Sequence, residues 1–129
     1  MTINPYKEGR CLVWDFICLD TFAGSHLSNT SREAGKAAET GERTKIAKYS
    51  CLPNDCSFVP VAIETAGPWG ESGLKLIREL GAKISEITGE NRSTAFLMQS
   101  ISVAIQRGNA ISILGTSNDH EKLDEIFYL

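Results

Sequence analysis

An aspartate in the middle of the chain's most apolar strand-like segment restricts the fold more than any other residue. Residues 10–20 read RCLVWDFICLD, with aromatic and β-branched side chains at both odd and even positions around Asp15. Such a run predicts a β-strand that is buried on both faces. Burying an ionised carboxylate there is costly unless an ion pair, hydrogen bonds or a metal ion replace its hydration. Asp15 therefore needs a partner. Asp20 lies at the end of the strand and points to the opposite face, where water can solvate it.

A second strand is predicted at residues 57–65, where β-branched residues alternate with other types. Pro60 has no amide hydrogen to donate, so this strand is expected at a sheet edge or at a bulge. Residues 32–49 between the two strands have the composition of a helix. The order strand, helix, strand predicts a small α/β domain.

The predicted helix at 32–49 has an inward stripe of small residues, which lets a helix approach a sheet closely. Steps of three and four along this stripe lead to Lys45 and Lys48, where apolar residues would be expected. The small residues are Ala34, Ala37, Ala38 and Gly41, and the candidate caps are Asn29, Thr30 and Ser31. Two lysines are thus predicted to point toward the strand that carries Asp15.

The rest of the chain is predicted to be mainly helical. Residues 21–30 are expected to form a loop, and residues 71–88 an amphipathic helix that Gly89 ends. Asn91 or Ser93 can begin another helix, which is interrupted at 107–109, and the short run that follows fits either helix or strand. The expected architecture is an α/β domain over 1–116, with a small mixed sheet flanked by helices. Residues 117–129 are expected to form a short helix or tail.

Composition narrows the classes of protein. The 129 residues are 42% hydrophobic and 22% charged, which is typical of a globular domain. The net charge of −3 argues against a domain that coats nucleic acid through bulk charge, although a local basic patch remains compatible with it. No run reaches the roughly 18 apolar residues of a membrane span, and the N-terminus lacks a secretory signal. The chain is expected to be soluble and intracellular, in the nucleus or the cytoplasm, with no membrane partner.

The four cysteines are candidates either for zinc ligands or for free thiols. Cys11 and Cys18 point to opposite faces of the predicted strand, and Cys51 and Cys56 have a spacing at the loose end of zinc sites. No histidine lies near them in the sequence to complete four ligands. Buried free thiols in a reducing compartment are the expectation.

Glu64 is a second acidic residue within an apolar strand-like segment, near the end of the second predicted strand. If the strands are neighbours, the two carboxylates can approach each other and bind a hard divalent cation such as Mg²⁺. Lys45 or Lys48 can then stabilise the negative charge that develops during phosphodiester hydrolysis. A structural ion pair between Asp15 and Lys45 explains these two residues equally well, and a solvated strand end explains Glu64 alone.

Four strings in the sequence resemble the region that follows the reverse transcriptase in many animal retrotransposon-type open reading frames. They are CLVWDFI at 11–17, AAE with KIAKY across 37–49, FVPVAIETAGPWG at 58–70 and ISVAIQRGNA at 101–110. The similarity covers roughly residues 9–116, and the last two strings are its most specific parts. The chain has no Tyr-x-Asp-Asp signature of the polymerase itself.

The acidic strand, the helix ending in Lys-x-x-Lys-Tyr and the second strand also resemble the latter half of a PD-(D/E)xK nuclease core, which is the restriction-endonuclease-like fold. In that superfamily one acid lies on an earlier strand, a second begins an acid-x-Lys triplet, and a lysine on the next helix can assist. The resemblance implies that Asp15 is the second acid and that Lys45 or Lys48 is the helix residue. Ile17 stands where the triplet has lysine, and the earlier helix and strand have no counterpart.

The resemblance implies three alternative functions. The preferred one is a retroelement-derived fragment of a DNA endonuclease-like domain that is inactive on its own. The second is an active Mg²⁺-dependent endonuclease, with Asp15, Glu64 and Lys45 or Lys48 as catalytic residues and the two acids as metal ligands. The third is a module that binds nucleic acid or protein without catalysis. DNA and a second copy of the chain are the candidate partners.

Overall fold

A computed structural model of the chain describes residues 1–116, and the predicted C-terminal helix or tail at 117–129 lies outside them. The chain divides into two compact units, Met1–Leu80 and Gly81–Leu129. The first unit contains two strands and two complete helices, and the helix α3 (Glu71–Thr88) begins in it. The expected α/β class is confirmed.

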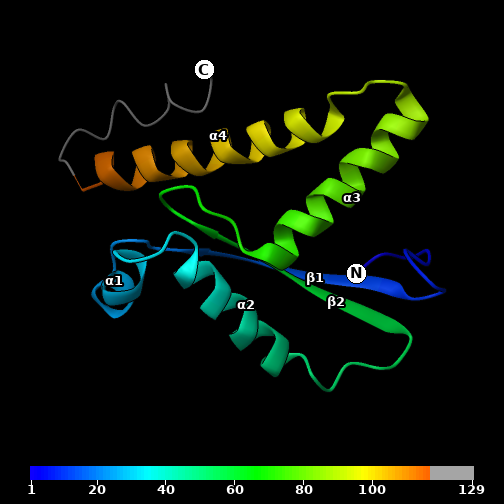
Figure 1. Ribbon diagram of the computed structural model, residues 1–129, viewed down its shortest axis with the longest axis horizontal. Coiled ribbons are helices and arrows are strands. Elements are labelled where there is room, and N and C mark those ends of the chain that lie inside the picture. The colour runs from blue at the N-terminus through cyan, green and yellow to red at the C-terminus, as the bar shows by residue number, and fades with distance from the viewer. Residues whose placement is uncertain (117–129) are drawn as a thin grey trace. The chain divides into compact units, whose positions relative to one another are not determined.

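The two strands of the first unit form a parallel sheet. β1 (Cys11–Leu19) and β2 (Cys56–Glu64) pair so that Cys11 lies opposite Cys56 and Leu19 opposite Glu64. The helix α2 (Lys36–Lys48) lies on the crossover between them, as the ribbon in Figure 1 shows. The strand, helix and strand were predicted, but the sheet of residues 1–116 is parallel rather than mixed.

Each face of the sheet packs against a different helix. On one face, side chains of β1 and β2 pack against small residues of α2. On the other face, side chains of both strands pack against the first turns of α3. The α2 cluster contains Leu19, Ala37, Ala38 and Ala62, and the α3 cluster contains Leu12, Val61 and Leu76. The stripe of small residues therefore does bring α2 close to the sheet: a Cβ on Gly41 would lie 3.0 Å from Leu19 Cδ1.

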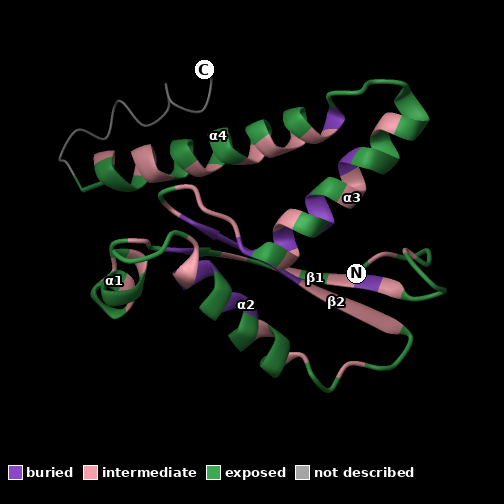
Figure 2. Ribbon diagram, viewed as in Figure 1, coloured by how far each residue is buried: buried purple, intermediate pink, exposed green. Residues whose placement is uncertain are grey.

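The prediction that β1 is buried on both faces is wrong. Trp14 and Phe16 are 53% and 46% exposed, and Cys18 on the same face is exposed too. Figure 2 shows this mixture of burial classes along β1. Only Leu12 of this face joins the cluster under α3. Cys51 is also exposed, and Cys11 and Cys56 are half-buried, so the four thiols are free as expected but none of them is fully buried.

A short helix replaces the loop expected at residues 21–30. This helix, α1 (Gly24–Thr30), follows a turn in which Asp20 Oδ1 accepts the amide hydrogen of Phe22 at 3.0 Å. The next helix, α2, begins four residues later than predicted. Gly35 precedes it with a φ of +86°, a left-handed conformation that favours glycine.

The second unit contains the end of α3 and the helix α4 (Ser93–Leu114). The interruption predicted at 107–109 is absent, because α4 continues through Gly108, at which a Cβ would meet nothing within 4 Å. Within α3, a Cβ on Gly81 would overlap Thr94 near the start of α4, so only glycine fits there. Over residues 1–116, none of the helices combines the length and the apolar character that crossing a membrane requires.

Candidate functional site

Asp15 lies at the centre of β1 and points toward α2. Its Oδ2 accepts a hydrogen bond from Lys45 Nζ at 2.6 Å and a second one from the Tyr49 hydroxyl at 3.1 Å. The side chains of Asp15 and Lys45 are 28% and 20% exposed, so solvent reaches the pair only in part. The expected cationic partner of Asp15 is therefore on the crossover helix.

The pair stabilises the charged form of both of its members. The hydrogen bond from Lys45 holds the pKa of the Asp15 carboxyl below its ordinary value of 3.8, against an opposing effect of burial. The same hydrogen bond raises the pKa of the Lys45 ammonium above 10.5, and burial again opposes it. Asp15 is consequently an anion, and Lys45 a cation, throughout the neutral range.

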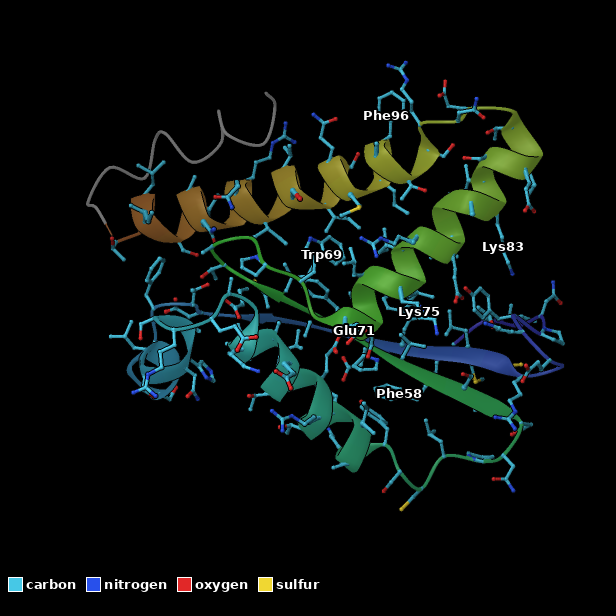
Figure 3. All side chains as sticks on the ribbon, in the orientation of Figure 1. Phe58, Trp69, Glu71, Lys75, Lys83 and Phe96 are labelled. Atoms are coloured by element: carbon cyan, nitrogen blue, oxygen red, sulfur yellow. The ribbon has the colours of Figure 1, made fainter. Side chains whose placement is uncertain are left out.

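Lys48 is close to the pair but is not bonded to the carboxylate. Its Nζ lies 5.4 Å from the centre of the Tyr49 ring, a distance at which a cation is attracted to the ring face. The Tyr49 ring also packs on Phe58, with 4.5 Å between the ring centres. Phe58, labelled in Figure 3, projects from β2 on the side of α2. The aromatic pair thus fixes the hydroxyl that donates to Asp15.

Glu64 has a different task at the end of β2. Its side chain is fully buried, and its Oε1 accepts the amide hydrogens of Ala37 and Ala38 at 2.9 and 3.2 Å. These are the second and third residues of α2, whose amides have no partner within the helix. A carboxylate there also meets the positive end of the helix dipole. Glu64 therefore caps α2 from a distant part of the sequence.

The structure does not bring Asp15 and Glu64 together. The residue opposite Asp15 in the register is Pro60, and Glu64 lies four positions further along β2. At about 3.3 Å per residue, this separates the two positions by roughly 13 Å along the sheet. The two acids cannot ligate one cation across that distance.

A buried acid that the sequence did not single out caps the next helix. Glu42 on α2 is 5% exposed, and its Oε1 and Oε2 accept the amide hydrogens of Gly73 and Ser72 at 3.1 and 3.3 Å. These are the third and second residues of α3. A Cβ on Gly70 would overlap the Glu42 carboxylate, so the approach depends on glycine there.

The two acids do not fit one shared magnesium centre. Mg²⁺ is bound through free carboxylate oxygens and retained waters, whereas Asp15 Oδ2 and Glu64 Oε1 already accept hydrogen bonds from Lys45 and from α2. The Lys45 ammonium would also repel a divalent ion beside Asp15. Among residues 1–116, no group of three or more His, Cys, Asp and Glu side chains is arranged to hold a metal.

Comparison of the chain with protein-family models, curated proteins and solved structures finds no match. The retroelement and nuclease resemblances therefore stay predictions from the sequence.

Two residues that bind the site's charged groups or cap its helices, Tyr49 and Glu42, were not predicted from the sequence. Tyr49 follows Lys45 by four positions, so the helical step that pointed to the lysine also points to the tyrosine. Glu42 directly follows Gly41 of the small-residue stripe, but its partner helix begins about thirty residues later. A local pattern could have found Tyr49, whereas nothing local marks Glu42.

Proposed function

We propose that this chain is a non-catalytic domain of retroelement origin, with the acidic strand, crossover helix and second strand of a restriction-endonuclease-like core. Support for the arrangement comes from the parallel pairing of β1 with β2 through α2. Support for the origin is the four strings described above. The domain serves as a folded module and does not cleave DNA.

The contact between Lys45 and Asp15 carries the proposal that the domain is inactive. In a metal-dependent nuclease the acid binds the cation and the lysine acts on the reacting phosphate or water. Here the lysine instead lies 2.6 Å from the acid, and the Tyr49 hydroxyl occupies the same oxygen. Glu64 is likewise committed to the amides of α2. The charged groups thus stabilise the packing of α2 on the sheet.

One observation favours an active endonuclease as a second candidate. Asp15 and Lys45 lie side by side and both are partly exposed. If a DNA phosphate drew the Lys45 ammonium away from the Asp15 carboxylate, it would lie close to both side chains. Such an enzyme would need further acidic ligands for its metal ion, because Glu64 lies too far along β2.

A plasmid-nicking assay decides between these candidates. Supercoiled DNA is incubated with the purified chain and Mg²⁺ or Mn²⁺, in parallel with Asp15→Asn and with a chelator. We expect no nicking above the chelated background for either protein. Metal-dependent nicking by the wild type that Asp15→Asn abolishes would overturn the proposal. Nicking that survives this substitution comes from a contaminant, because the proposed chemistry requires the Asp15 carboxylate.

DNA binding without cleavage is measured separately. Fluorescence anisotropy with a labelled duplex, at several salt concentrations, tests whether the domain is a nucleic-acid binding module. A binding constant that falls steeply with salt indicates phosphate contacts. Lys48→Gln is a suitable variant, because Lys48 is exposed and has no ion pair with Asp15.

A further inference from the structure

Two free thiols occupy partner positions at the start of the sheet. Cys11 is the first residue of β1 and Cys56 the first residue of β2, and they lie opposite each other in the parallel register. Cys11 has the parity of Asp15 and Cys56 that of Phe58, and both of these side chains contact α2. Since side chains of equal parity share a face, the two thiols project from the same face of the sheet.

The spacing of the strands suits a covalent link. Neighbouring strands lie about 4.8 Å apart, and the Cα atoms of disulfide-bonded cysteines lie roughly 4.4–6.8 Å apart. The two strands are also fixed to each other at this point, because the Cys11 amide donates to the Asp55 carbonyl at 2.9 Å. The two thiols are half-buried, so a small oxidant can reach them.

The other two cysteines lack such a partner. Cys18 lies opposite Ile63 in the register and points to the opposite face from Cys11. Cys51 lies before β2, where its thiol is 4.0 Å from the Ser50 hydroxyl. The fold therefore selects one pair of thiols, although the sequence brings Cys51 closest to Cys56.

We propose that Cys11 and Cys56 are a site of oxidative modification at which the folded chain forms an intramolecular disulfide. The proposed oxidant is a small-molecule disulfide such as oxidised glutathione. One protein thiolate attacks a glutathione sulfur, which forms a mixed disulfide and releases one glutathione thiolate. The second protein thiolate attacks the mixed disulfide and releases the other glutathione. The protein loses two electrons and two protons, and the glutathione disulfide gains them as two thiols.

The chemistry of Cys56 affects the rate of this exchange. Burial, and then the neighbouring Asp55 carboxylate, raises the pKa of the Cys56 thiol above its ordinary value. Because the thiolate is the attacking species, exchange at Cys56 is expected to accelerate as the pH rises above neutral. This site is independent of the proposed function, since it requires only the parallel register of β1 and β2.

The test is to map the disulfides of the folded and the unfolded chain. Both are equilibrated with a mixture of oxidised and reduced glutathione, alkylated, digested and analysed by mass spectrometry. In the folded chain we expect Cys11–Cys56 to be the main intramolecular disulfide. In a denaturant, closing the short loop from Cys51 to Cys56 is favoured over the long loop from Cys11 by roughly 25-fold. The preferred pair should therefore change when the fold is lost.

Two serine variants provide the matched comparison. Cys51→Ser should leave the Cys11–Cys56 link at its wild-type yield, whereas Cys11→Ser should abolish it and leave Cys56 reduced or joined to glutathione. The wild-type map needs no variant, so a variant that fails to fold does not weaken the test. The proposal is overturned if folded wild-type chain pairs Cys56 mainly with Cys51, or if Cys11 and Cys56 carry only separate glutathione adducts.

Discussion

Substituting Glu64 distinguishes a helix cap from a metal ligand. Only Oε1 of Glu64 has partners in the described part of the chain, and Oε2 is buried without one. Glu64→Gln keeps one oxygen that can accept both amides of α2, and its NH₂ group takes the place of Oε2, which is already buried without a partner. The main loss is the interaction of the charge with the helix dipole. That interaction is worth about 0.3–2 kcal/mol. Glu64→Ala removes both hydrogen bonds.

The expected difference follows from the groups left buried. Glu64→Ala leaves the amides of Ala37 and Ala38 without an acceptor, at about 1–3 kcal/mol for each unsatisfied group. A loss of about 3–4 kcal/mol is therefore expected for alanine, against about 1 kcal/mol for glutamine. Urea denaturation followed by circular dichroism measures both. With a slope of about 1.5–2 kcal/mol per molar urea, the alanine midpoint should fall by about 2 M.

Glu42→Gln is the matched control for Glu64→Gln. Both oxygens of Glu42 accept amide hydrogens, so the new NH₂ group must face either Ser72 or Gly73 as a second donor. Losing one hydrogen bond to a charged group costs about 1.5–3 kcal/mol. The same substitution should thus cost more at position 42 than at position 64.

The reasoning is refuted if Glu64→Gln destabilises the chain as much as Glu64→Ala. That result would mean that the second oxygen carries an essential charge, as a metal ligand does. A wild-type urea midpoint that rises with added Mg²⁺ would support the same conclusion, because a bound ion stabilises the folded state by mass action.

The remaining predictions concern Asp15 and the glycines. The pKa of Asp15 is lowered on folding, so its contribution to stability is complete above its ordinary value of 3.8 and is lost as the pH falls through the folded pKa. Asp15→Asn should therefore flatten the fall of the urea midpoint in that acidic range, and an unchanged slope would contradict the ion pair. A Cβ on Gly73 would lie 3.1 Å from the Val61 Cα, so Gly73→Ala should lower the stability by about 1–3 kcal/mol. A Cβ on Gly108 would meet nothing within 4 Å, so Gly108→Ala should raise the stability by up to about 1 kcal/mol. Thermal melting of the two glycine variants measures both changes.

Local patterns predicted those parts of the site that lie on one face of one element. A continuous run of apolar, β-branched and aromatic residues placed Asp15 in a strand, and the helical stripe placed Lys45 and Lys48 on the face of the helix that meets it. The distance between Asp15 and Glu64 depends on the register of two parallel strands. Parity fixes the face of a side chain but not its position along the partner strand. The sequence therefore predicted the ion pair and missed the separation of the acids.

The burial of β1 shows a related limit. An apolar residue at every position predicts two buried faces, but burial requires that other elements cover both. α3 covers one face only near Leu12, and Trp14 and Phe16 lie beyond the cluster that it forms. How much of this face α3 covers depends on the point at which α3 leaves the sheet. The pattern of residues 10–20 contains no information about that point.

The two buried acids follow one physical rule, which explains why the chain keeps them despite the cost of burial. A side chain at the N-cap position normally satisfies the free amides of a helix from a residue in the β region. Gly35 precedes α2 with a φ of +86°, where residues with side chains are strained, and a side chain at Gly70 would overlap the Glu42 carboxylate. Each glycine thus excludes a local side-chain cap, and Gly70 also makes room for the remote carboxylate of Glu42. Because Glu64 holds the start of α2 and Glu42 of α2 holds the start of α3, the acids connect sheet and helices in sequence. Chemistry that required either acid to be released would loosen the helix that it caps.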